Sequence, residues 1–158
     1  MYNDERVIFT SQTLVVDNTP AHAAGDVLAE TVAMTLVGLP SRTGRAHQIE
    51  VVSVRVDDPD DQGVNLDVVL MVADNELGTI NTAVDMTDAE RKASLQKGGV
   101  VLVDTWHDFV IGQIGIEEGL HVPMEFEGTD IYVGMISRGT GTYAGAALEL
   151  TIGYKVRT

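Results

Sequence analysis

Apolar and polar residues alternate with a period of two along most of this chain. From Leu148 to Val156 every second residue is apolar, and the residues between them are polar or small. The stretch 66–72 repeats the pattern with Leu66, Val68, Leu70 and Val72. Successive side chains of a strand point to opposite faces, so both stretches are predicted to be strands with one buried face.

The alternation changes phase once, between His47 and Asp57. Ile49 and Val51 share one face, whereas the apolar positions from Val52 to Val56 have the other parity. One extra residue in a strand restores the phase, so a β-bulge near Val51-Val52 is predicted to turn both sets toward the core.

Further apolar stretches are separated by turn-forming sequences and extend the strand pattern over the chain. The additional predicted strands are Val7–Val16, Val27–Val37, Val100–Trp106, Phe109–Ile116, Leu120–Phe126 and Ile131–Ser137, with turns that include Gly38–Ser41 and Glu117–Gly119. About eight short strands at this spacing favour a sandwich or a barrel.

One segment departs from the strand pattern. Thr87 and Glu90 have the spacing of a capping box, and Lys97-Gly98 forms a suitable end. We therefore predict a short helix over Asp88–Lys97, on a crossover between the two halves of the sheet structure. The fold class predicted is all-β: a jelly-roll-like antiparallel β-sandwich of about eight strands with one short crossover helix.

The chain has 158 residues, which suits a single domain spanning 1–158. It contains no cysteine, so disulfides and cysteine metal sites are excluded. Its polar start, Met1–Arg6, does not resemble a signal peptide, and its apolar runs are far shorter than the roughly 20 residues of a membrane helix. We interpret 1–6 as an N-terminal arm that becomes ordered on a neighbouring molecule.

The net charge of −14 argues against two classes of partner. Nucleic-acid binding needs clustered Lys and Arg to neutralise phosphates, and anionic membrane surfaces repel an acidic protein. Neither nucleic acid nor membrane is therefore expected as a partner.

The densest acidic stretch, Asp57–Gly63, imitates the start of a calcium loop. Asp58, Asp60 and Gln62 stand at alternate positions, and a glycine follows. However, the position that should carry a bidentate Glu is Val69, so the alternative is a turn in which these residues serve the backbone. Apart from this calcium hypothesis, no cofactor is expected.

No other motif predicts chemistry. The histidines at 22, 47, 107 and 121 lack metal-ligand spacing, and His107 and Asp108 are strand neighbours that point apart. The glycine-rich segment Gly139–Gly145 precedes a strand and lacks the lysine of a phosphate-binding loop. We predict that the protein is not an enzyme.

Three stretches together resemble a known family. Asp60–Val68, Leu77-Gly78-Thr79 and Ile136–Thr140 are similar to segments of small virion proteins encoded in the structural modules of tailed bacteriophages. The resemblance extends over nearly the whole chain and rests on turns and strand edges.

The resemblance implies a capsid decoration or cement protein, located on the exterior of the virion head after assembly in the host cytoplasm. Its expected partners are the major capsid protein and further copies of itself, a trimer being favoured over a dimer. The family has no catalytic residues to transfer. The alternatives are a head-fibre or tail-associated β-sandwich that binds host-surface glycans, an enzyme of unknown type, and a host-encoded stand-alone sandwich.

Overall fold

The computed structural model describes residues 6–16, 21–96, 99–143 and 147–157. It contains nine strands and one helix within these ranges: β1 (Ile8–Leu14), β2 (Val27–Thr35), β3 (His47–Asp58), β4 (Leu66–Met71), α1 (Asp88–Ser94), β5 (Val100–Val103), β6 (Trp106–Asp108), β7 (Gln113–Phe126), β8 (Asp130–Ser137) and β9 (Leu148–Arg157). The described residues include no helix long and apolar enough to cross a membrane.

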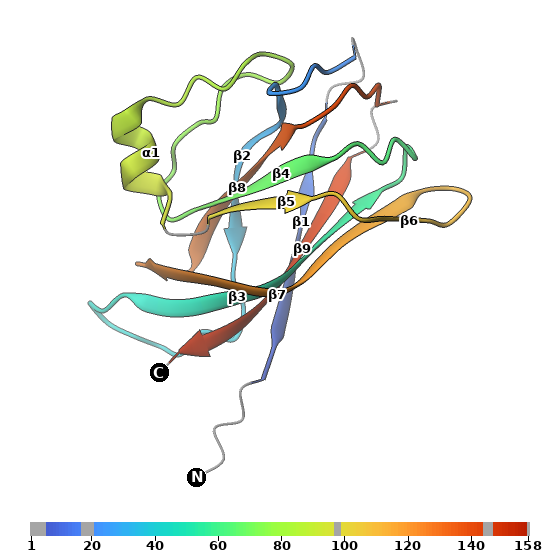
Figure 1. Ribbon diagram of the computed structural model, residues 1–158. Helices are drawn as coiled ribbons and strands as arrows, with labels where there is room; N and C mark the ends of the chain where they lie inside the picture. The colour runs from blue at the N-terminus through green and yellow to red at the C-terminus, as the bar shows by residue number, and fades with distance from the viewer. Residues whose placement is uncertain (1–5, 17–20, 97–98, 144–146, 158) are drawn as a thin grey trace.

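The strands form two antiparallel sheets that pack face to face (Figure 1). The five-stranded sheet has the order β1-β9-β3-β7-β6, and the four-stranded sheet has the order β2-β8-β4-β5. Consecutive strands alternate between the sheets, except that β4 and β5 share one sheet and β6 and β7 share the other. This connectivity confirms the predicted jelly-roll-like sandwich.

The predicted bulge in β3 is present. The pairing of β3 with both of its neighbours shifts between Val51 and Ser53, so the side chains of Val51 and Val54 are both fully buried although their parity differs. On β7 the same irregularity contains Gly119, whose φ is +69°. The turn predicted at Glu117–Gly119 is therefore wrong, because this glycine supplies the positive φ of a bulge inside one long strand.

The helix α1 begins as predicted but lies on a different kind of connection. Thr87 is the N-cap, and its reciprocal hydrogen bonds with Glu90 complete the capping box. The helix ends at Ser94, and the expected stop at Lys97-Gly98 lies outside the described residues. The prediction of a crossover between sheet halves is wrong, because the connection joins β4 to its own neighbour β5.

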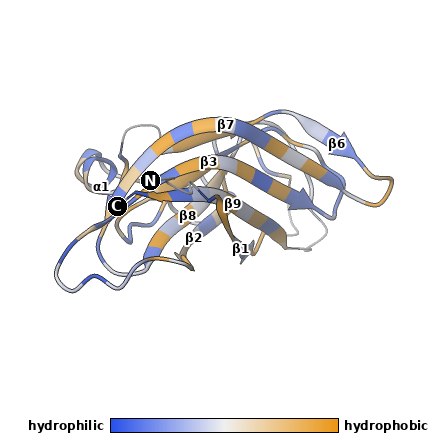
Figure 2. Ribbon diagram, turned by 90° about the horizontal axis from the view of Figure 1, so that it is seen from below, coloured by the Kyte–Doolittle hydropathy of each residue, from blue (hydrophilic) through white to orange (hydrophobic). Residues whose placement is uncertain are grey.

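The core fills the space between the two sheets, where the alternating apolar residues of β3 and β9 meet those of β4 and β8. Figure 2 shows this alternation of apolar and polar residues along β3 and β7. A second, smaller cluster lies outside the sandwich, on the outer face of the four-stranded sheet. It comprises Val27, Val69, Met71 and Leu77, with Met86, Leu95, Tyr132 and Ile136 packed around them. The β4–β5 connection thus covers the outer face of the four-stranded sheet, which the alternation of residues predicts to be exposed to water.

Candidate functional site

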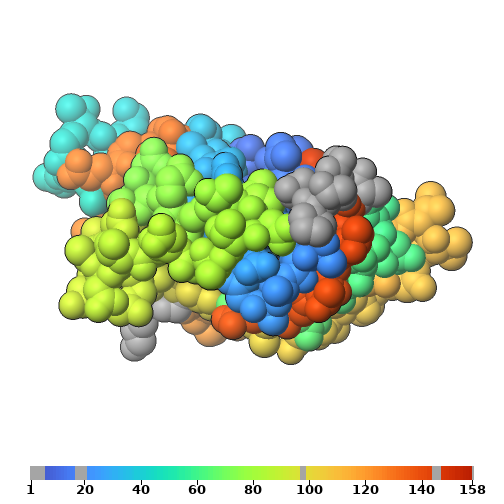
Figure 3. Space-filling model, turned by 90° about the horizontal axis from the view of Figure 1, so that it is seen from above, coloured from blue at the N-terminus to red at the C-terminus, as the bar shows by residue number. Residues whose placement is uncertain are grey.

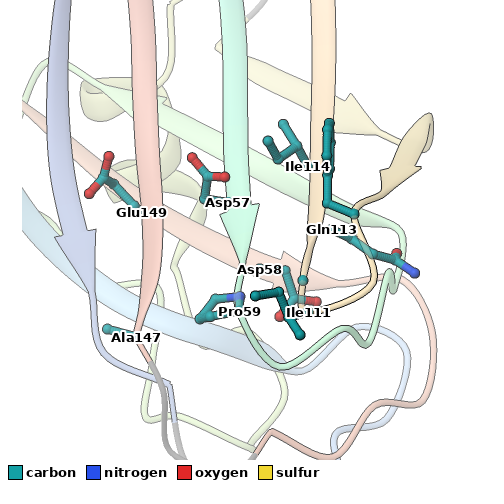
Figure 4. A pocket seen from close by; sticks show the side chains of 10 residues that line it. Asp57, Asp58, Pro59, Ile111, Gln113, Ile114, Ala147 and Glu149 are labelled. Atoms are coloured by element: carbon teal, nitrogen blue, oxygen red, sulfur yellow. The ribbon is translucent and has the colours of Figure 1, made fainter.

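Three segments that are distant in sequence meet at one end of the sandwich. They are the acidic turn 57–63, the glycine-rich loop 139–143 and the loop 109–112 of the β6–β7 hairpin. The amide of Thr142 donates to the side-chain oxygen of Gln62 at 3.0 Å. A Cβ atom on Gly112 would lie 3.1 Å from the carbonyl oxygen of Asp58, so the hairpin rests directly on the acidic turn. A groove of about 370 Å³ lies between the acidic turn, the hairpin and the start of β9 (Figure 4).

Asp58 organises the acidic turn from a buried position, with an exposed fraction of 1%. Its carboxylate accepts hydrogen bonds from the backbone N–H groups of Asp60 and Gln62, both at 2.9 Å, and of Gly63 at 3.1 Å. Burial raises the pKa of Asp58 above its ordinary value, although these three donors act in the opposite direction. The carboxylate therefore holds the backbone of the turn.

The same contacts bear on the calcium hypothesis for Asp58, Asp60 and Gln62. The side-chain oxygen of Gln62 already accepts from Thr142, and its amide group donates to the carbonyl of Asp60 at 3.1 Å. Within the described ranges, no three histidine or acidic side chains form a group that could hold a metal ion. Calcium binding stays a prediction, and the hydrogen bonds favour the alternative of a backbone turn.

The β6–β7 hairpin presents three consecutive apolar residues to solvent, which we call the apolar tip. Phe109, Val110 and Ile111 have exposed fractions of 59%, 87% and 88%. The loop is closed by a hydrogen bond of 2.9 Å from the amide of Phe109 to the carbonyl of Gly112. The tip extends beyond β6 as a hydrophobic loop at the end of the hairpin (Figure 2).

The backbone of the tip is strained at its centre. Val110 has φ of +78°, a conformation that branched side chains rarely adopt and that costs on the order of 1–3 kcal/mol. The carboxylate of Asp108 accepts from the Val110 amide at 2.8 Å and thereby supports this conformation. Such strain, together with exposed apolar side chains, is typical of a segment shaped for contact with another molecule.

The prediction of a strand for the apolar tip is wrong. A strand was predicted over Phe109–Ile116, but β7 begins at Gln113 and the tip is a loop. The apolar run imitates a buried strand, whereas the local signals of a loop are only Asp108 and Gly112. An aspartate that binds the backbone two residues later, followed by a glycine, is the signal that identifies the loop.

The four histidines lie in separate surroundings. His22 is fully buried and packs edge-on against Tyr143, with ring centroids 5.9 Å apart, and neither of its ring nitrogens has a hydrogen-bond partner. His47 packs against Phe126, while His107 is exposed on β6. The carboxylate of Asp108, the strand neighbour of His107, accepts a hydrogen bond from the Val110 amide and so supports the hairpin loop.

The fourth histidine belongs to a charged cluster on the outer face of the five-stranded sheet. Glu50 binds the His121 ring at 2.6 Å and the Arg157 guanidinium through Nε at 3.2 Å. These hydrogen bonds, that of Arg157 first, lower the pKa of Glu50 from 4.5 to about 2. The cluster joins β3, β7 and β9 across the sheet.

A change of Glu50 to Gln is expected to alter the pH dependence of stability. Ionised Glu50 stabilises the native state at pH values above about 4.5, and this contribution is lost as the pH falls toward about 2. The difference in unfolding free energy between the native chain and E50Q should therefore narrow across this range, as urea titrations at several pH values would measure. Glu149→Gln supplies the same charge change on β9. A difference for E50Q that stayed constant with pH would contradict the prediction.

No family model matches the chain, and no curated protein matches it significantly.

Proposed function

We propose that this chain is a structural protein of a tailed-phage head: a capsid decoration or cement protein that binds major-capsid subunits on the exterior of the virion and stabilises the shell. It is assembled in the host cytoplasm. It acts mechanically, through many contacts multiplied by valency, and not as a catalyst.

The observation that carries the proposal is the distribution of exposed apolar side chains on an acidic jelly roll. The two most exposed of them, Val110 and Ile111, lie in the apolar tip, and Phe9 and Val37 form a second group at the start of β1, whereas the net charge of the chain is −14. Concentrated apolar surface on a compact module indicates contact with other proteins. The resemblance of Asp60–Val68, Leu77–Thr79 and Ile136–Thr140 to phage virion proteins supplies the class of partner.

Those three stretches serve the fold. The amide of Arg138 donates to the carbonyl of Asn65 at 2.8 Å, and its guanidinium binds the buried carboxylate of Asp67. Leu77 lies over Gly134 of β8. These contacts are structural, so the resemblance concerns the scaffold of the protein. None of these residues is proposed to bind the capsid.

The glycan-binding alternative requires aromatic side chains gathered in one groove. Among the described residues, Phe9 and Phe109 are the exposed phenylalanines, and they line separate grooves, one beside β1 and one beside the acidic turn. This arrangement favours the capsid proposal over a glycan platform.

Capsid binding is tested with undecorated heads of the phage whose genome encodes this chain. We expect the purified protein to sediment with the heads and to appear as regular density on their exterior. Deletion of residues 1–6 should reduce the bound fraction if this segment is an arm that contacts the capsid, and unchanged binding would refute the arm. Circular dichroism of the deleted chain verifies that it is folded.

Absence of binding at every salt concentration would contradict the decoration role. A panel of host-surface glycans then tests the fibre or tail alternative. The genomic neighbourhood provides an independent check, because genes for portal, protease and major capsid protein beside this one are expected only for the head proposal.

A further inference from the structure

Two exposed apolar surfaces lie at opposite corners of the five-stranded sheet. One is the apolar tip, which extends from the edge strand β6 beside the end of β3. The other is a groove at the start of β1, the opposite edge strand, in which Phe9 and Val37 are 61% and 53% exposed. We call it the β1 groove; it is lined by Arg6, Val7, Ile8, Phe9, Val37 and Gly38.

The strand register separates the two surfaces along the strands as well as across the sheet. Ile8 is paired with Tyr154, whereas Leu14, at the far end of β1, is paired with Leu148 beside the acidic turn. The tip therefore cannot reach the groove of its own chain. Figure 3 shows the segment around β6 projecting from one end of the molecule and the segment that follows residue 40 projecting from the other.

The two corners also differ in charge. The groove beside the tip is lined by Asp57, Asp58 and Glu149, and Asp108 lies at the base of the tip. At the other corner, Arg6 lines the β1 groove. A cation is thus placed where the acidic corner of another copy could be received.

We propose that the apolar tip of one copy inserts into the β1 groove of a second copy of this chain. The contact is head to tail, because the two surfaces differ and lie at opposite corners; repeated around an axis, such contacts close a ring when the rotation between copies permits it. Apolar side chains are buried at its centre, and opposite charges at its rim offset the repulsion between two acidic chains. The inference identifies the self-contact expected for the proposed head protein.

The tip and the β1 groove of this chain are complementary to each other in shape of contact and in charge. A lipid surface would also receive apolar side chains, but the carboxylates around the tip oppose approach to anionic headgroups. A second copy supplies both the apolar groove and the cation of Arg6. Each copy then uses both surfaces, so both the apolar tip and the β1 groove are covered in a closed ring.

The experiment measures the mass of the full chain in solution by light scattering and sedimentation, with no capsid present. Its outcome is therefore independent of the test of head binding. We expect a concentration-dependent oligomer that dissociates as salt rises, since salt screens the charged rim. Ile111→Asp in the tip and Val37→Asp in the groove should each weaken association at least about 30-fold, because each buries a charge in an apolar contact.

Val100→Asp is the matched control, because Val100 is 47% exposed on β5 and belongs to neither surface. It should leave the oligomer intact. In a mixture of the two variants, the intact tip of V37D should insert into the intact groove of I111D, which restores one contact per pair. The mixture should therefore yield dimers, although each variant alone is monomeric.

Three results would overturn the inference. A native chain that is monomeric at all attainable concentrations lacks the contact. An oligomer unaffected by both I111D and V37D uses another surface. Flotation of the native chain with phosphatidylcholine vesicles, lost in I111D, would assign the tip to a lipid surface.

Discussion

Replacement of Leu77 by Ala is expected to lower the free energy of unfolding by about 3 kcal/mol. Leu77 is 2% exposed in the smaller cluster outside the sandwich, where it packs with Val69 and Met71. Its backbone is held by hydrogen bonds with the Thr31 hydroxyl at 3.2 Å and the Asp85 amide at 2.8 Å. The surroundings therefore cannot collapse into the space left by the lost side chain, and the penalty of the cavity adds to the lost burial.

Val84→Ala is the control for this prediction, because Val84 lies in the same connection but is 38% exposed. Its effect should stay within about 0.5 kcal/mol. Urea unfolding followed by fluorescence of Trp106 measures both variants. A loss for L77A as small as that for V84A would show that the β4–β5 connection contributes little to global stability.

The sequence predicts where the strands β3, β4 and β9 lie, but it does not predict that a strand is buried on both faces. Alternation identified β9 and the phase change in β3, because in both cases one face of the strand meets the core and the other meets water. β4 is buried on both faces: Val69 and Met71 pack with Leu77 of the β4–β5 connection, and Asp67 binds the Arg138 guanidinium. The alternation of residues within β4 does not show that residues later in the chain bury its outer face.

The candidate site illustrates a second limit. The acidic turn and the glycine-rich loop were recognisable from composition, but their contact through Gln62 and Thr142 arises only from the pairing of distant strands. The apolar tip was misassigned, because Phe109–Ile111 satisfies a hydrophobic pattern while lying outside the core. A pattern reports that side chains are apolar, and it does not report which molecule buries them.

Asp58→Asn is expected to destabilise the chain by about 2 kcal/mol, although it preserves the shape of the side chain. Three backbone N–H groups point at the two carboxylate oxygens. An amide offers one oxygen only, so in either orientation its NH2 group faces at least one of these donors. The stabilisation lost with those hydrogen bonds exceeds the free energy gained by no longer burying a charged carboxylate. Because burial raises the pKa of Asp58, this group alone favours the native state as the pH falls, opposite in sign to Glu50.

Asp61→Asn is the matched control for this change. Asp61 lies in the same turn and is exposed, and Asn tolerates its φ of +56°. Urea unfolding should separate the two variants by nearly the full effect. Since Gly112 rests on the Asp58 carbonyl, D58N should also raise amide exchange at Phe109, whose N–H closes the tip, and weaken head-to-tail association, whereas D61N should do neither. Equal stability of D58N and D61N would mean that the turn does not depend on the buried carboxylate, and its support of the apolar tip would have to come from the backbone alone.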